Sequence, residues 1–173
     1  MNEAANAHGR YFVRCYRPDG SLRWSAIAEN VVTTVGKDLA LDSYLSGAAY
    51  TVNGPFLGLI SSVSFVGVAA TDTMAVHPGW TEAGLANAPT YGPTRPTSVF
   101  APAAGGSKTT APATVFSISS TGTIKGAFLV FGPGAVSTID SPLGTLYSAG
   151  LFTGGNQPVD NGDTMNVTYT ASL

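Results

Sequence analysis

The fold class is decided by the last stretch of the chain, residues 163–173, which reads Asp-Thr-Met-Asn-Val-Thr-Tyr-Thr-Ala-Ser-Leu. Every second residue from Met165 to Ala171 is apolar, and the residues between them, from Thr164 to Thr170, are threonine or asparagine. Strict alternation is typical of an antiparallel strand with one face in the core and the other toward solvent. The sequence therefore predicts that the chain ends in a half-buried β-strand.

The same alternation occurs near the start of the chain. Residues 10–17 place Tyr11, Val13 and Cys15 on one face, and Pro18-Asp19-Gly20 follows them. This tripeptide favours a turn, because proline fixes φ and glycine permits positive φ. Residues 21–32 then return as a second strand, so the sequence predicts a β-hairpin.

One helix is predicted, over about residues 35–45. Thr34 is a candidate N-cap, and Gly47 ends the helical run. Leu41, Tyr44 and Leu45 recur at helical spacing. We expect this apolar stripe to lie over the edge or end of a sheet.

The rest of the chain shows short apolar runs between turn signals. Further strands are predicted at residues 56–60, 63–68, 114–119, 123–131 and 144–153, with a hairpin joining 114–119 to 123–131. Residues 88–112 hold five of the eleven prolines. Because proline cannot donate a ladder hydrogen bond, we expect residues 83–112 to form an extended loop at a sheet edge or an arm over a neighbour.

These elements predict an all-β fold, an antiparallel β-sandwich or jelly-roll-like barrel with one short α-helix. A length of 173 residues with 44% apolar residues fits one domain. We expect residues 10–173 to form it and residues 1–9, which include His8, to be a flexible N-terminus. Neither a signal peptide nor a membrane-spanning segment is expected.

Charged residues are unusually few. The chain has 8 Lys and Arg and 10 Asp and Glu, or 10% of its length, where soluble domains carry roughly a quarter. Serine, threonine and asparagine lose less on desolvation than ions do, so this composition favours a protein whose surface becomes covered by partners. Extracellular β-proteins can show the same bias. The net charge of −2 argues against nucleic acid as a partner.

The sequence contains no catalytic signature. Cys15 is the only cysteine, and we expect it to be a buried small hydrophobic residue. His8 and His77 are too few and too far apart for a zinc site. The stretch Asp160-Asn161-Gly162-Asp163 lacks the distal ligands of a calcium loop and reads as a turn. We expect no enzyme activity, no cofactor and no metal.

Candidate partner contacts come from two regions. Five of the eight basic residues lie before residue 38 and predict a basic edge that meets an acidic partner. The proline-rich segment is the second region. The predicted contact residues are Arg10, Phe12, Arg14, Tyr16, Arg17, Arg23, Tyr91 and Arg95.

Three stretches, together 65 of the 173 residues, resemble a known group of proteins. They are Gly20 to Leu45 with Gly-Ser-Leu-Arg-Trp-Ser, Ala70 to Glu82 with Gly-Trp-Thr-Glu, and Gly144 to Tyr169 with Asp-Asn-Gly-Asp-Thr-Met. Together they are similar to small virion structural proteins of tailed bacteriophages. The middle segment, residues 83–112, has no counterpart in that resemblance.

The resemblance implies a capsid cement or decoration protein on the outer capsid surface, synthesised in the host cytoplasm. It also implies the major capsid protein as partner, and repeated attachment to a symmetric shell favours self-association as a dimer or trimer. An alternative is a tail, fibre or baseplate protein that binds host-surface glycan through Trp80, Tyr91 and the loop between them. A third hypothesis is a polysaccharide hydrolase, for which Glu29 and Glu82 are the conceivable carboxylates.

Overall fold

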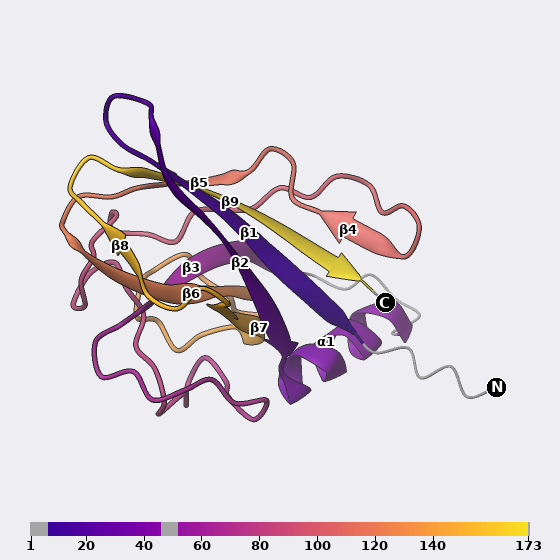
Figure 1. Ribbon diagram of the computed structural model, residues 1–173. Coiled ribbons are helices and arrows are strands. Elements are labelled where there is room, and N and C mark those ends of the chain that lie inside the picture. Colours follow the sequence, from indigo (N-terminus) through magenta and orange to yellow (C-terminus); the bar gives the residue numbers. More distant parts are fainter. Residues whose placement is uncertain (1–6, 46–51, 173) are drawn as a thin grey trace.

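The computed structural model describes residues 7–45 and 52–172 of the chain. These residues form one nine-stranded sheet and one helix (Figure 1). The elements are β1 (His8–Tyr16), β2 (Leu22–Val32), α1 (Thr34–Leu45), β3 (Asn53–Ser61), β4 (Ser107–Thr109), β5 (Thr114–Ser117), β6 (Gly122–Gly132), β7 (Thr145–Phe152), β8 (Gln157–Val159) and β9 (Thr164–Ser172).

The strand order is β3-β6-β7-β2-β1-β9-β4, with β5 paired to β9 and β8 paired to β6. All of these pairings are antiparallel. The sheet curls so that its two ends approach each other, which confirms the all-β prediction in the form of a partly closed barrel.

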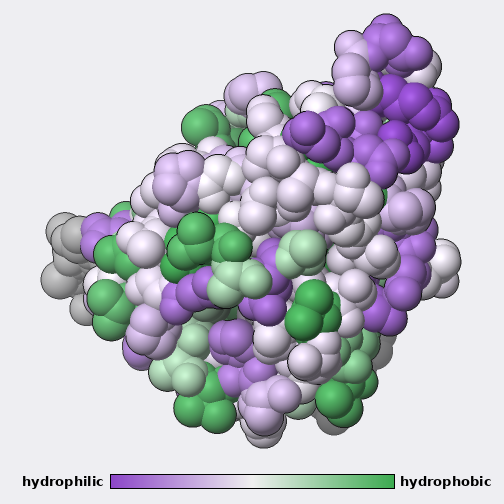
Figure 2. Space-filling view, turned by 90° about the vertical axis from the view of Figure 1, so that its left-hand side faces the viewer, coloured by the Kyte–Doolittle hydropathy of each residue, from purple (hydrophilic) through white to green (hydrophobic). Residues whose placement is uncertain are grey.

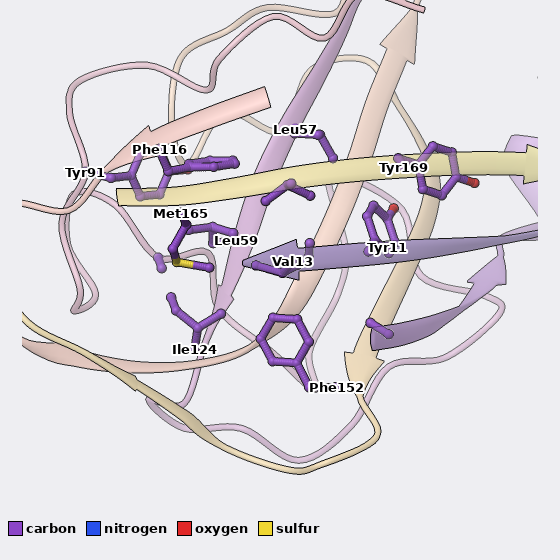
Figure 3. Packing of buried hydrophobic residues seen from close by; sticks show 14 of the residues in the cluster. Tyr11, Val13, Leu57, Leu59, Tyr91, Phe116, Ile124, Phe152, Met165 and Tyr169 are labelled. Atoms are coloured by element: carbon purple, nitrogen blue, oxygen red, sulfur yellow. The ribbon is translucent and has the colours of Figure 1, made fainter. Parts of the chain in front are cut away.

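The main core fills the inside of the curl (Figure 3). Alternate residues of β1 and β9 point inward, and Tyr11 lies opposite Tyr169 with ring centroids 4.5 Å apart. Leu57 and Leu59 of β3 face them from the other end of the sheet. The prediction that β1 and β9 each have one buried face is thus confirmed, and Cys15 is fully buried as expected.

A second core lies on the outer face of β3, β6 and β7. Phe128 and Val130 of β6 belong to this outer core, while Leu129 belongs to the inner core. The outer core is closed by Trp80, whose indole Nε1 donates to Asp72 Oδ2 at 2.9 Å. Residues 62–82 therefore cover this half of the sheet, and the expected strand at 63–68 is a turn and irregular chain instead.

The helix matches its predicted range, but its contacts differ from the prediction. Thr33, not Thr34, caps it, because the Gly36 amide donates to Thr33 Oγ1 at 3.0 Å. Gly36 packs against the backbone of Tyr147 at a point that leaves no room for a Cβ. The helix contacts the rest of the protein through Gly36 in its first turn and through Leu39, which are its two buried residues. The prediction that Leu41, Tyr44 and Leu45 form the packed face is therefore wrong. Leu41, Tyr44 and Leu45 are 57%, 86% and 70% exposed.

The β1–β2 hairpin is confirmed, but the hairpin predicted for residues 114–131 is wrong. β5 pairs with β9, with Phe116 opposite Met165, whereas β6 pairs with β3, β7 and β8. The predicted flexible N-terminus is also too long, because His8 already pairs with Ser172 in the sheet. Residues 1–6 of that expectation, and the helix stop at Gly47, lie outside the described residues.

The proline-rich segment packs along an edge of its own sheet, which is the first of the two predicted alternatives. It runs along the free edge of β3, where the Ala83 amide donates to the Leu59 carbonyl at 2.9 Å and the Ser98 amide to the Pro55 carbonyl at 2.8 Å. It then reaches β9, where the Thr110 amide donates to the Tyr169 carbonyl at 2.9 Å. Residues 81–112 therefore form a seam that closes the gap between the two ends of the sheet.

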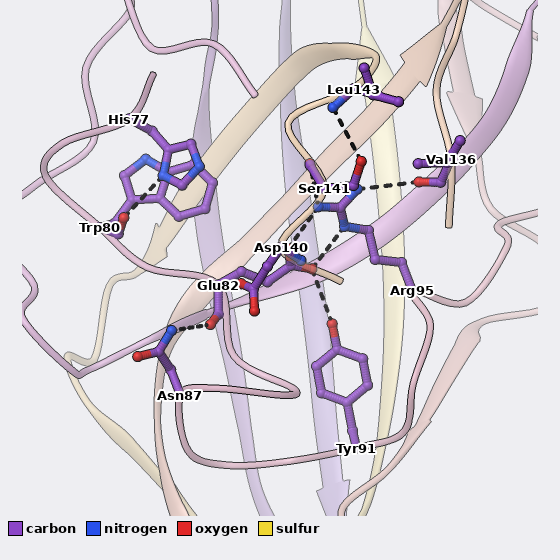
Figure 4. A network of polar contacts seen from close by, with 10 residues as sticks. All are labelled: His77, Trp80, Glu82, Asn87, Tyr91, Arg95, Val136, Asp140, Ser141 and Leu143. Carbon is purple, nitrogen blue, oxygen red and sulfur yellow. Dashed lines mark hydrogen bonds and ion pairs between the residues drawn. The ribbon is translucent and has the colours of Figure 1, made fainter. Parts of the chain in front are cut away.

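A buried ion pair holds the seam in place (Figure 4). Arg95 Nε and Nη2 donate to Glu82 Oε1 and Oε2 at 2.8 and 2.7 Å. The guanidinium also donates to the carbonyls of Val136 and Ser141 at 3.2 and 3.1 Å. Both side chains are almost completely buried, so each charge relies on the other and on these backbone groups.

We expect Glu82→Gln to lower the free energy of unfolding by about 3–5 kcal/mol, because it leaves the Arg95 charge buried without a counter-ion. Urea unfolding followed by circular dichroism measures this effect. Glu29→Gln, at an exposed position on β2, is the matched control and should change stability by less than about 0.5 kcal/mol. Equal effects of the two substitutions would contradict the role of the ion pair.

Candidate functional site

The outer face of β9, β1 and β2 is not covered by any described segment, in contrast to the outer face of β3, β6 and β7. The ladder places Phe12 at its centre, with Ile27 of β2 on one side and Thr168 of β9 on the other. Arg10 and Arg14 flank Phe12 on the same face of β1. We call this surface the open face, and it contains four of the predicted contact residues: Arg10, Phe12, Arg14 and Tyr16.

An apolar centre lies in the open face. Phe12 and Ile27 are half-buried, and the Arg14 guanidinium lies over the Phe12 ring, 4.9 Å from its centroid. A hollow of about 270 Å³ adjoins this pair, and Thr153 and Gln157 also line it. An apolar spot beside a hollow, surrounded by polar groups, is the usual arrangement of a protein contact surface.

The β9 side of the open face is lined with neutral polar groups. Thr164, Asn166, Thr168 and Thr170 form a row of half-buried side chains beside β1. Thr170 Oγ1 is hydrogen-bonded to Thr109 Oγ1 of β4 at 2.9 Å, which extends the row to the next strand. Such groups can change partners at low cost, because their desolvation penalty is much smaller than that of an ion.

The predicted basic edge divides into free and engaged arginines. Arg10 and Arg14 make no ion pair within the described part of the chain. Arg23 instead binds Asp160 at 2.7 Å and Asp163 at 2.9 Å. Its guanidinium is therefore part of the fold, and the prediction that it contacts a partner is not supported by its surroundings.

Arg17 lies at the projecting end of the β1–β2 hairpin, where its Nη1 donates to Ser21 Oγ at 3.2 Å and to the Leu22 carbonyl at 3.1 Å. This end is the largest continuous hydrophilic region in Figure 2, at its upper right. Arg17 is exposed there but stabilises the turn, so it differs from Arg10 and Arg14 in having local acceptors.

Tyr91 and Arg95 were predicted as contacts in the proline-rich segment, and the structure corrects this. Arg95 is 1% exposed and Tyr91 is 8% exposed. Tyr91 packs edge-on against Phe116, and its hydroxyl donates to Glu82 Oε1 at 3.4 Å. Both side chains point into the seam, where no partner reaches them.

Metal-ligating side chains are scattered across residues 7–45 and 52–172. No group of three or more His, Cys, Asp or Glu side chains lies close enough there to hold a metal ion. His77 stacks on Trp80 at 4.0 Å, and its Nδ1 contacts the Trp80 carbonyl at 3.0 Å. Nor does this part of the chain contain a helix with the length and apolar character needed to cross a membrane.

The turn at residues 160–163 is structural. The Asp160 amide donates to Asp163 Oδ2 at 2.8 Å, and both carboxylates bind Arg23. These contacts hold residues 160–163 together as a turn, which agrees with the interpretation of this stretch.

Sequence reasoning found the β1 residues of the open face but missed Ile27 and the hollow next to it. Alternation indicates that Ile27 lies on the same face of β2 as Ser25 and Glu29. It does not indicate which face of the sheet stays uncovered. Residues 62–82 cover the outer face of β3, β6 and β7 through long-range contacts, and no local sequence pattern predicts such contacts.

A scan against protein-family models found no match, and neither did a search of curated proteins.

The single cysteine gives a test of the core. Burial, followed by the nearby Asp163 carboxylate, raises the pKa of the Cys15 thiol to about 12. Because the thiolate is the reactive form, we expect a disulfide reagent at pH 8 to leave the folded protein unlabelled for hours. The unfolded protein in urea should be labelled within minutes. Rapid labelling of the folded protein would contradict the burial of Cys15.

Proposed function

We propose that this chain is a virion structural protein, a capsid cement or decoration protein that binds the major capsid protein of a tailed phage. The resemblance of residues 20–45, 70–82 and 144–169 to small phage virion proteins supports this proposal. The observation that carries it is the open face, an uncovered sheet surface with an apolar centre, a neutral polar row and two arginines that form no ion pair with any described residue.

The chemistry of the open face suits a folded protein as partner. Phe12 and Ile27 supply apolar area that is already held by the sheet, so little side-chain entropy is lost on binding. Arg10 and Arg14 match an acidic surface, since charges at the rim of an interface steer association and set its register. A sheet fixed by pairing on both sides of β1 gives the rigid platform that such a contact requires.

The proposed role does not need tight binding by one copy. Many copies on one capsid, or a dimer or trimer with several attachment points, raise the overall affinity through effective concentration. The proposed location is the outer capsid surface, which the protein reaches after synthesis in the host cytoplasm.

The two rival hypotheses have less support. A glycan site built on Trp80 and Tyr91 requires accessible rings, and these are 2% and 8% exposed. A hydrolase built on Glu29 and Glu82 requires both carboxylates in one cleft. Glu82 is locked to Arg95, while Glu29 lies on the open face.

The test of the proposal is attachment to particles that lack the protein. We expect Arg14→Glu to lower capsid occupancy at least tenfold at low salt, with a smaller difference at high salt, because charge attraction is screened. Phe12→Ala should lower occupancy at both salt concentrations, because it removes apolar contact area. Co-sedimentation of purified protein with the particles measures occupancy.

Lys37→Glu is the control for Arg14→Glu, because it makes the same charge change at an exposed position. Lys37 is part of the predicted basic edge, but it lies on α1 and not on the open face. This substitution should leave occupancy unchanged. If the unmodified protein fails to sediment with capsids, or if particles without it keep full resistance to heat and osmotic shock, the cement proposal is wrong. Adsorption of phage to host cells blocked by the free protein would favour the glycan-binding alternative.

A further inference from the structure

A separate pocket lies at the α1 end of the curled sheet. Its volume is about 590 Å³, which is within the range of small-molecule sites. Leu129, Tyr147 and Tyr169 form part of its lining and belong to the inner core. The pocket is thus the mouth of the partly closed barrel, a place where side chains do not fill the interior.

The lining of the mouth is apolar. Phe100 and Phe131 contribute rings, and Leu41 and Tyr44 of α1 stand at the rim, which explains the apolar residues that the helix leaves exposed. The Tyr169 hydroxyl is engaged away from the pocket, because it accepts hydrogen bonds from Asn30 Nδ2 at 2.8 Å and Ser148 Oγ at 3.3 Å. The mouth therefore offers apolar surface rather than hydrogen-bonding groups.

One charged residue, Lys108, is part of the lining. Lys108 of β4 lies directly opposite Ala171 of β9, so both side chains are on the inner face of the sheet, where Ala171 also lines the pocket. Within the described residues the Lys108 ammonium has neither an ion-pair nor a hydrogen-bond partner. An apolar hollow with one uncompensated positive charge at its edge is complementary to an anion with an apolar tail.

We propose that the mouth binds one anionic amphiphile, a carboxylate with an unbranched acyl chain. The chain lies against Leu129, Phe131 and Tyr169, and the carboxylate stays at the rim beside Lys108. A slim, flexible chain fits a hollow that reaches the inner core, whereas a folded partner surface meets only the rim. This site is on the inner side of the sheet and is independent of the open face and of the proposed capsid contact.

The test uses decanoate, below its micelle concentration, titrated into the full-length protein and followed by calorimetry. We expect saturable binding of one decanoate per chain. Lys108→Glu should weaken it about tenfold at low salt, because attraction is replaced by repulsion. The cationic probe decyltrimethylammonium, with the same chain length, should bind more weakly than decanoate to the unmodified protein and more tightly to the Lys108→Glu variant.

Two further variants test whether decanoate binds in the mouth and not elsewhere on the molecule. Arg14→Glu changes the charge by the same amount on the open face and should leave decanoate binding unchanged. Ala40→Phe, which adds a ring to the lining, should weaken both probes about tenfold, with an unchanged circular dichroism spectrum as the check on folding. Lys108→Glu is at an exposed position, so its effect does not depend on whether Ala40→Phe folds.

The proposal is overturned if decanoate does not saturate at one site, or if Arg14→Glu weakens it as much as Lys108→Glu does. It is also overturned if neither probe binds while Lys108→Glu reduces capsid occupancy. That result would mean that the mouth contacts the capsid protein instead of a small anion. Loss of capsid attachment in Arg14→Glu with intact decanoate binding supports both proposals. Decanoate binding by a protein that never attaches to capsids supports this one alone.

Discussion

The Glu82–Arg95 ion pair fixes the closure of the sheet, and the surfaces of the molecule depend on that closure. β3 is at one end of the curl, and β4, paired to β9, is at the other. The seam between these ends is rich in proline, so it does not continue the β4 ladder as far as β3. The arginine instead binds Glu82 and two carbonyls of residues 136–141. Two buried charges are tolerated because nearly every donor and acceptor is satisfied.

The sequence predicted the elements well and their long-range pairing poorly. Alternation identified β1, β2 and β9, because each has one face in the inner core. No local signal shows that Phe116 meets Met165 on β9, 49 positions further along the chain, instead of pairing with the next strand. Arg95 was misread for the same reason, since its carbonyl acceptors at Val136 and Ser141 lie more than 40 residues away.

For the open face too, the sequence predicts the local pattern but not the long-range contacts. The β1 pattern places Arg10, Phe12 and Arg14 on one face, and the structure agrees. The strand β6 has outward side chains too, yet Phe128 is fully buried because residues 62–82 lie over it. Whether an outward side chain is a surface residue depends on what the loops cover, and this is decided by contacts such as that of Trp80 with Asp72.

The positions of the few charged residues bear on the nature of the surface. Asp72, Glu82, Arg95 and Asp163 are buried and hold loops, so the surface carries even fewer ions than the composition suggests. Arg10, Arg14 and Lys108 are cations without ion pairs in the described structure, and Arg14 and Lys108 lie beside apolar surface. β9 separates them, because Thr170 faces outward and Ala171 faces the mouth. The two proposed binding surfaces therefore lie on opposite faces of one strand, so a substitution on one face leaves the other unchanged.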